Sequence, residues 1–416
     1  MVKGRNAISK TLAAAVVIII IIIAIGGGYY YYTMTQAKEK PIVVGLVTPL
    51  SGTFAPDGQM VEDGVQLAVN YINSHGGVLG HKVTLVVKDE GTTTQTALTA
   101  VQTLVEDYHV EFLIGPFWSG DVAAVLPFTY SHHVVEILTV SSLNALLKPP
   151  YNEYVFRVTL PDSGYAYMAV QWLKLIGAKN AVFLAEDYLY AHEVANFTVS
   201  LAKANGINIS WVSFYPGTAT DYSTAISQIA SLKPDAVIVV MEGTNGVDFQ
   251  KQYSSNPVTA KIPILDLESL LDNPQYAQTV DAAVPNGMNY VFLGEMSTIT
   301  NESASFSKML QQTYGIPFNH YAVDSYDGMM VLAMAINRAG TTNTTAVANA
   351  LMQTYYTGPA GIIKFAPDHE PLVGPGYLTG TLYQVRVINN SIYYEIIWPT
   401  SVANSTAINP ATGKPY

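Results

Sequence analysis

Two apolar, β-branched runs, Ile42–Val47 and Val83–Val87, flank a stretch in which apolar residues recur at helical spacing. Short runs of this kind, bounded by Pro, Gly and Ser, predict buried strands of a parallel sheet. The stretch Val61–Ile72 is apolar on one side and acidic or amide-bearing on the other, which predicts a helix. The glycines at 76 and 77 can adopt the positive φ that ends such a helix. We expect a right-handed strand-helix-strand unit, whose Pro49–Asp57 loop lies where open α/β sheets usually bind ligands.

The same alternation continues in two runs, which predicts two lobes built on parallel sheets, before the chain turns helical and closes with β-like stretches. The further expected strands are Glu111–Ile114, Val134–Val140, Tyr154–Val158, Ala181–Ala185, Ile209–Phe214, Ala236–Met241, Gly361–Phe365, Thr381–Ile388 and Ile392–Trp398. The further expected helices are Ala97–Val105, Val122–Phe128, Tyr165–Ile176, Glu193–Ala204, Tyr222–Ser231, Val247–Tyr253, Phe306–Tyr314, Tyr321–Ala339 and Thr345–Thr354.

The N-terminus carries Lys3, Arg5 and Lys10 ahead of an uncharged stretch, Leu12–Tyr32, that ends in four tyrosines. As a helix this stretch would be about 31 Å long, enough to span a bilayer. The basic residues would stay inside and the tyrosines would lie at the outer interface, as in a retained anchor. Two alternatives are a cleaved secretory signal and a segment processed at a site like that of archaeal pilins, at residues 3–4. All three place residue 38 onward outside the membrane.

Composition narrows the possible partners. The net charge of −11 argues against nucleic acid, and the absence of Cys excludes disulfides, thiolate metal sites, a Cys nucleophile and a lipidated Cys. Six Asn-x-Ser/Thr sequons agree with an exterior location and are candidate glycosylation sites. They are Asn196, Asn208, Asn301, Asn343, Asn389 and Asn404.

Signatures of common enzymes are missing. The loop after the first expected strand reads TPLSGTFAPDG, where a dinucleotide site needs G-x-G-x-x-G. The pair His192-Glu193 lacks the second His of H-E-x-x-H, and His132 and His133 are adjacent rather than four residues apart. Neither G-x-S-x-G nor a P-loop occurs. We therefore expect a binding protein without enzymatic activity, cofactor or metal.

Several longer segments resemble one family. Residues 42–90 and the later stretches VEFLIGPFWSGDVAAVLP, DAVIVV, YAVDSYDGMMVLAMAINRAG and GPAGIIKFAPD follow the order found in the leucine/isoleucine/valine-binding protein family. These are type I periplasmic or extracellular solute-binding proteins of ABC importers. The resemblance extends from Pro41 to about Pro399, and the N-terminus makes the chain look like an archaeal, membrane-anchored member.

The resemblance implies an α/β, type I periplasmic-binding-protein fold. Two Rossmann-like lobes with parallel sheets would be joined by three crossings near Thr159, Leu293 and Ala366, with the ligand in the cleft and one N-terminal transmembrane helix added. Lobe 1 would comprise residues 38–159 and 294–365, and lobe 2 residues 160–293 and 366–403. Residues 1–37 would be the signal or transmembrane anchor and its linker, and residues 404–416 a disordered tail.

The resemblance also implies ligand contacts from lobe 1. Ser119, in GPFWSG, matches the family's Ser that holds the α-carboxylate of the ligand, and it precedes an expected helix whose N-terminus favours an anion. An ordinary helix N-cap is the alternative, and both roles are compatible. Leu143 replaces a Thr donor of the family, with Ser141 and Ser142 beside it. This altered clamp puts an α-amino-acid ligand in doubt.

Further contacts would come from lobe 2 and from two lobe-1 loops. Glu268 matches the family's acid that pairs with the ligand's ammonium, and a helix cap is the alternative role. Tyr190 matches a pocket Tyr, or is an ordinary loop residue. Glu242 lies where the family has a cleft aromatic residue, and Trp118 and Asp57 complete the set. Several acids with aromatic residues suit a cationic or hydroxyl-rich ligand.

The resemblance thus implies an extracellular substrate-binding protein of an ABC transporter. It would capture an amino acid, amide, polyamine or sugar-like solute and deliver it to the permease subunits in the membrane. It would be held at the cell membrane by a single-pass N-terminal anchor. The alternative is the ectodomain of a ligand-binding sensor that acts with a signalling partner.

Overall fold

The computed structural model describes residues 21–25, 40–241, 243–268, 290–294, 300–374, 376–378, 380–388 and 391–416. The chain divides into two units, Met1–Pro41 and Ile42–Tyr416. In the described part of the chain, no helix is both long and apolar enough to cross a membrane. The span predicted at Leu12–Tyr32 lies outside the described residues, apart from the helical residues 21–25.

The first sheet of the larger unit has the order β2-β1-β3-β4-β5, and each pair of neighbours is parallel. β1 pairs with β2 on one side and with β3 on the other, so the strand order reverses between β1 and β3. The carboxyl ends of these two strands therefore flank a topological switch point. This confirms the predicted parallel unit of two strands around a helix. The strands are β1 (Ile42–Thr48), β2 (Val83–Asp89), β3 (Phe112–Ile114), β4 (Val135–Leu138) and β5 (Val155–Arg157).

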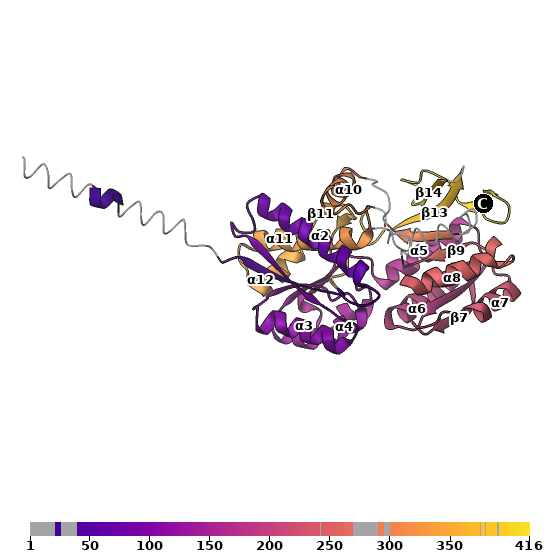
Figure 1. Cartoon of the computed structure of the whole chain (residues 1–416), viewed down its shortest axis with the longest axis horizontal. Helices are drawn as coiled ribbons and strands as arrows, with labels where there is room; N and C mark the ends of the chain where they lie inside the picture. Colours follow the sequence, from indigo (N-terminus) through magenta and orange to yellow (C-terminus); the bar gives the residue numbers. More distant parts are fainter. Residues whose placement is uncertain are drawn as a thin grey trace, which may run out of the picture. The chain divides into compact units, whose positions relative to one another are not determined.

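Helices cover both faces of this sheet (Figure 1). On one face, α2 packs against α11 so closely that a Cβ on Gly64 would collide with the carbonyl oxygen of Ala322. The other face is covered by α3 and α4, whose apolar residues form a second cluster with Val47 and Leu113. The elements of this lobe are α2 (Ala55–Ser74), α3 (Thr94–Glu106), α4 (Ser119–Ser131), α10 (Asn301–Tyr314), α11 (His320–Ala339), α12 (Thr344–Leu351) and the short helices η1 (Asn144–Leu147) and η2 (Asn152–Tyr154).

The second sheet repeats the connectivity of the first. Its order is β14-β13-β10-β9-β8-β6-β7, so β6 to β10 follow the same order as β1 to β5. Side chains of β6 alternate, with Phe183 facing the cluster around Trp172 and Leu184 facing the cluster around Tyr222. The elements are α5 (Asp162–Leu175), β6 (Asn180–Glu186), α6 (Leu189–Ala204), β7 (Asn208–Tyr215), α7 (Ser223–Leu232), β8 (Ala236–Val240), α8 (Gly243–Ser255), η3 (Thr259–Lys261), β9 (Ile264–Asp266) and β10 (Tyr290–Gly294).

The end of the chain departs from a purely parallel pattern. β13 (Thr381–Ile388) pairs antiparallel with β10 and with β14 (Ser391–Trp398), and a hairpin of β11 (Tyr356–Gly358) and β12 (Gly361–Ile363) precedes them. Only two residues separate β13 from β14, too few for the helical crossover that a parallel pair requires. The chain passes from the first sheet to the second after β5, returns after β10 and passes again after β12. The exact lobe limits stay a prediction.

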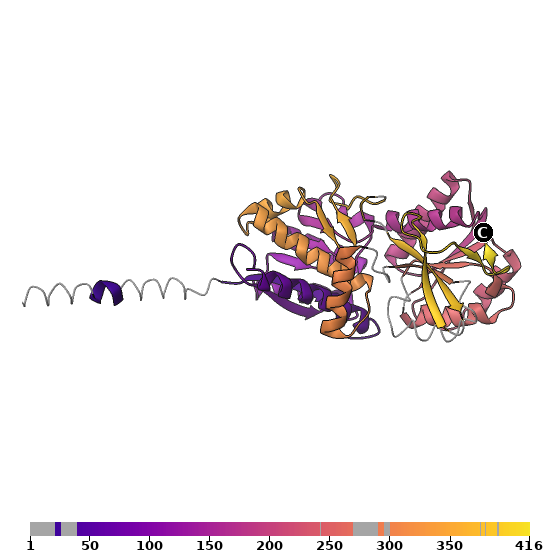
Figure 2. The ribbon, with the colours of Figure 1, turned by 90° about the horizontal axis from the view of Figure 1, so that it is seen from above.

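The expectation of a disordered tail after residue 403 is wrong. β15 (Ile408–Asn409) pairs with β16 (Lys414–Pro415), and both views place the C-terminus beside β13 and β14 (Figures 1 and 2). The buried amide of Gln384 donates to Ile408 O and accepts from Ile408 N–H, each at 2.8 Å. These two bonds, together with the burial of Ala407 and Ile408, order a segment whose composition alone indicates a loose tail.

Candidate functional site

A pocket with an empty volume of about 440 Å³, which includes its opening to solvent, lies at the carboxyl ends of strands from both sheets. From the loops after β3 and β4 it is lined by Phe117, Trp118, Ser119, Val140, Ser141 and Ser142. Its other lining residues are Tyr165 on α5, Tyr190 on α6, Leu267 and Glu268 after β9, and His320 and Tyr321 on α11.

Ser119 is the first residue of α4, and Trp118 holds the N-cap position. The reading of Ser119 as an ordinary N-cap is therefore wrong, because the extended residue before the helix is Trp118. The Ser141 hydroxyl donates to Ser119 Oγ at 3.0 Å, so two hydroxyls from different loops meet at the pocket wall. The helix N-terminus beside them favours a polar, electron-rich group of a ligand.

Glu90 supports the loop that leads into α4. It follows β2, is fully buried, and accepts the N–H of Phe117 at 2.9 Å and that of Trp118 at 3.2 Å. Burial raises the pKa of Glu90 well above its ordinary value, the two N–H donors oppose this rise, and nearby Asp121 adds to it. The carboxyl of Glu90 thereby sets the path of the backbone that presents Trp118 and Ser119 to the pocket.

Arg157 supports the second serine loop in a similar way. This fully buried side chain at the end of β5 donates from Nε to Ser141 O at 2.9 Å and from Nη2 to Leu143 O at 2.6 Å. The side chain of Leu143 packs into an apolar cluster with Leu138 and Leu147 rather than lining the pocket. The position of the family's Thr donor therefore offers the pocket no hydroxyl here.

Asn144, next along this loop, joins elements of both lobes. Its N–H donates to Glu193 of α6 at 2.6 Å, and its Oδ1 accepts the N–H of Ser163 of α5 at 2.9 Å. Its amide also donates to Glu370 Oε1 at 3.2 Å. The serine loop of the first lobe is thus tied to the helices of the second lobe beside the pocket.

Glu268 also lines the pocket, as the second residue after β9. Its N–H donates to Asp266 Oδ1 at 3.1 Å, and its own Oε1 is shielded from solvent with no hydrogen-bond partner among the residues that the structure describes. Burial raises the pKa of Glu268 well above its ordinary value, and the charges of Glu186 and Asp162 raise it further. A ligand that donates hydrogen bonds or carries positive charge would satisfy this carboxyl.

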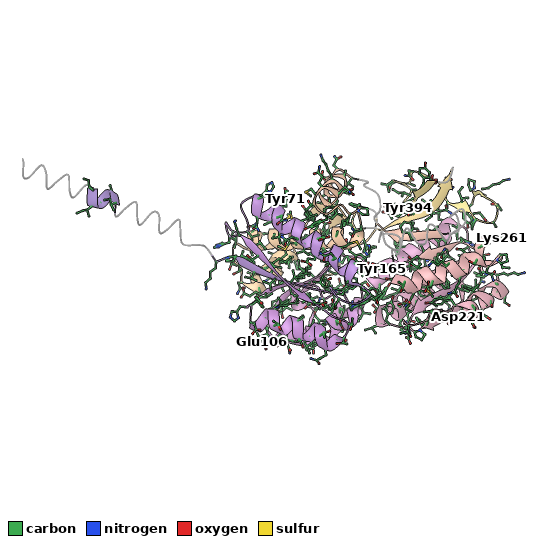
Figure 3. All side chains as sticks on the ribbon, in the orientation of Figure 1. Tyr71, Glu106, Tyr165, Asp221, Lys261 and Tyr394 are labelled. Atoms are coloured by element: carbon green, nitrogen blue, oxygen red, sulfur yellow. The ribbon has the colours of Figure 1, made fainter. Side chains whose placement is uncertain are left out.

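Aromatic side chains make up a large part of the pocket lining. Phe117 packs on Tyr321 with 5.5 Å between ring centroids, and Tyr190 packs on Tyr188 at 5.2 Å. Tyr165, labelled in Figure 3, stands on α5 where the ribbons of the two lobes meet. Burial raises the pKa of the Tyr165 hydroxyl well above its ordinary value, and the charges of Glu268, Asp324 and Asp162 add to this effect.

Most of the candidates named from the sequence meet in this pocket. They are Ser119, Ser141, Ser142, Trp118, Tyr190 and Glu268. Asp57 is buried in the first turn of α2 and is not a lining residue, and Glu242 lies outside the described residues. The binding roles of all these residues stay a prediction.

The sequence reasoning missed Phe117, Val140, Tyr165, Leu267, His320 and Tyr321. Phe117 and Leu267 were detectable as direct neighbours of named candidates. No local pattern marks His320 and Tyr321, which follow the N-cap Asn319 on a helix distant in the chain. Among the described residues, no group of three His, Asp or Glu side chains is placed to hold a metal ion.

The predicted sequons differ in how available their side chains are. Asn196, Asn208, Asn301, Asn343 and Asn404 are exposed, and Asn389 lies outside the described residues. The Oδ1 atom of Asn343 caps α12 by accepting the N–H of Ala346 at 3.0 Å, and that of Asn404 accepts the N–H of Ile396 at 2.8 Å.

Comparison with known proteins relates this architecture to one family. The model of a family described as periplasmic binding protein matches residues 41–382. A Leu/Ile/Val-binding protein of Rhizobium johnstonii is 26% identical over 313 residues, which cover 74% of this chain and 83% of that protein. An uncharacterized protein of Methanocaldococcus jannaschii is 24% identical over 322 residues, covering 74% of this chain and 76% of its own.

Solved structures share the fold at low identity. An ABC transporter substrate-binding protein from Sphaerobacter thermophilus has a TM-score of 0.77 at 23% identity, covering 86% of this chain and 97% of its own. A branched-chain amino acid substrate-binding protein from Streptococcus pneumoniae, in complex with isoleucine, has a TM-score of 0.73 at 22% identity, covering 86% and 100%. A solute-binding protein from R. palustris, in complex with benzoate, has a TM-score of 0.73 at 20% identity, covering 85% and 95%.

Proposed function

The chain belongs to the periplasmic binding protein family, and on that premise we propose that it is the extracellular solute-binding subunit of an ABC importer. The resemblance to leucine/isoleucine/valine-binding proteins is confirmed, as is an α/β fold with parallel strands. The proposed subunit captures a small polar solute and delivers it to the permease, without enzymatic turnover. Relatives of this fold in complex with isoleucine and with benzoate support a pocket for small solutes.

The observation that carries this proposal is that Ser119 and Glu268, which come from different lobes, both line one pocket. Ser119, with the Ser141 hydroxyl and the N-terminus of α4, faces a polar or electron-rich pole of the solute. Glu268, from the other sheet, faces a donor or cationic pole. Charge-assisted hydrogen bonds are worth about 1.5 to 3 kcal/mol each, or roughly ten- to a hundredfold in affinity.

Thermal unfolding of the full-length protein with amino acids, amides, polyamines and sugars tests this function. A solute that binds only the folded state stabilises it by roughly 2.7 kcal/mol at a hundredfold excess over Kd. We expect one class to raise the melting temperature and Ser119→Ala to reduce that rise. The absence of any shift together with turnover of a substrate would overturn the proposal. Uptake by a co-reconstituted permease separates an importer subunit from the alternative, a sensor ectodomain.

The proposed location is the outer face of the cell membrane, with residues 12–32 retained as an anchor and residue 38 onward outside. The Lys3, Arg5 and Lys10 cluster ahead of that apolar stretch supports this orientation. We expect the protein to fractionate with membranes and its bulk to be cleaved by external protease. Soluble protein beginning after residue 26 would show a cleaved signal instead. Mass spectrometry of peptides that contain Asn196 and Asn301 tests the proposed glycosylation.

A further inference from the structure

We infer that the ligand of this pocket is an organic cation that lacks a carboxylate, in other words an amine or a quaternary ammonium compound. This inference rests on the proposed solute-binding function and narrows its substrate class. The inference rests on three observations: the carboxyl groups in and near the pocket, its aromatic lining, and the fact that several hydrogen-bond donors that a carboxylate would need already bind other groups of the protein.

Carboxyl groups from elements of both lobes lie in or near the pocket. Glu268 lines the pocket, and Glu186, Asp162 and Asp324 lie near enough for their charges to act on Glu268 or on Tyr165. Among the described lining residues, His320 is the one basic side chain. A bound cation would relieve the repulsion between these acids, whereas a carboxylate would add to it.

Arg157, whose charge acts on nearby Asp162, uses its guanidinium to bind other groups of the protein. Its Nη1 atom contacts both carboxyl oxygens of Glu370, at 2.6 and 2.7 Å. Its Nε and Nη2 donate to the carbonyl oxygens of Ser141 and Leu143. Arg157 thus supports the pocket wall from behind and has its strong donors engaged.

Several of the donors at the serine end are also engaged. The N–H groups of Phe117 and Trp118 both donate to Glu90, and the Ser141 hydroxyl donates to Ser119 Oγ. A desolvated carboxylate requires several donors to offset the loss of its hydration. This end therefore fits a hydroxyl or another neutral polar group better than a second negative charge.

The walls suit the cationic end of such a ligand. Phe117, Trp118, Tyr165, Tyr190 and Tyr321 line the pocket together. The face of an aromatic ring attracts ammonium groups, and aromatic cages closed by a carboxylate recognise quaternary ammonium ligands. Glu268 lines the same pocket, and a bound cation would favour the ionised form of its carboxyl.

Isothermal titration of the full-length protein with matched pairs tests the inference. The pairs are 2-phenylethylamine against L-phenylalanine, 3-methylbutylamine against L-leucine, and choline against glycine betaine. In each pair the second compound differs essentially by its carboxylate. We expect at least one cation to bind ten times more tightly than its carboxylate-bearing partner.

The outcomes separate this inference from the proposed function. The cation inference would be overturned if the amino acid, betaine, or a sugar or amide from the wider panel bound more tightly. The proposed solute-binding function would then still hold. Failure of every compound to bind would overturn both. For a cation that binds, Glu268→Gln should weaken affinity at least tenfold, and Trp118→Leu should weaken it as well. Glu106→Gln is the matched control, because Glu106 is exposed on α3 away from Tyr165 (Figure 3).

Discussion

Arg157 and Glu370, which are 213 residues apart in the chain, form a buried ion pair with 2.6 Å between Nη1 and Oε1. The pair joins the end of β5 to the segment after β12, next to two of the passages between the sheets. Because Arg157 also holds the carbonyl oxygens of Ser141 and Leu143, this one contact links those passages to the pocket wall.

Removal of one partner should be costly. Glu370→Ala leaves the Arg157 guanidinium buried without its counter-charge, so we expect the free energy of unfolding to fall by about 3 to 5 kcal/mol. Urea unfolding followed by fluorescence measures this loss. Asp368→Ala is the control, since the exposed pair of Asp368 with Lys148 at 3.7 Å should be worth at most about 1 kcal/mol. Equal losses in the two variants would contradict the structural role of Arg157.

Glu136, fully buried on β4, should make stability depend on pH. Burial raises its pKa to about 8, from 4.5 in an exposed site, while the Thr129 hydroxyl opposes the rise. Between these values the folded chain holds a proton that the unfolded chain has lost. The stabilisation is therefore complete below pH 4.5, falls by up to about 1.4 kcal/mol per pH unit as the pH rises toward 8, and is lost above it.

Unfolding of the parent and of Glu136→Gln at pH 5, 6.5 and 8 measures this effect. We expect the parent to lose stability relative to the variant as the pH rises, because Gln does not titrate. Parallel curves would show that Glu136 keeps an ordinary pKa. The same two proteins should bind the ligand alike, since Glu136 is not a lining residue.

Glu90 should affect binding through the backbone that it holds. In Glu90→Gln the amide NH₂ would face one of the two N–H donors of Phe117 and Trp118, so one contact is lost. We expect the affinity for the identified solute to fall about tenfold, an effect of about 1.4 kcal/mol. Titration calorimetry measures it, with the exposed Glu106→Gln as the control. Unchanged affinity would show that the loop keeps its path without this carboxylate.

The C-terminal hairpin should contribute to stability. Deletion of residues 405–416 removes the two hydrogen bonds between the buried Gln384 amide and the backbone of Ile408, so the free energy of unfolding should fall by at least about 1 to 3 kcal/mol. In the truncated chain, Gln384→Leu should recover part of this loss because the amide that bonded Ile408 is then replaced by an apolar side chain. Identical melting of the truncated and full-length proteins would contradict the role of the hairpin.

Local patterns in the sequence predicted most of the strands and helices of both lobes, but not the short strands β9, β10 and β11. The runs at Ile42–Val47 and Val83–Val87 became β1 and β2, with α2 between them, because short-range periodicity reports directly on burial. Gly76 and Gly77 have the expected positive φ of 101° and 76° after α2. Motif positions also led to Ser119 and Glu268, which do line one pocket.

Only the tertiary structure decided what surrounds those residues. Tyr165, His320 and Tyr321 line the pocket from two helices. The periodicity of each helix shows which of its faces is buried, but not which distant segment packs against that face. Three further contacts likewise join distant segments of the chain. Arg157 pairs with Glu370, Glu90 accepts hydrogen bonds from the backbone before α4, and Gln384 bonds the C-terminal segment. Such contacts leave no local repeat in the sequence, because the partner that satisfies a buried polar group is chosen by the fold.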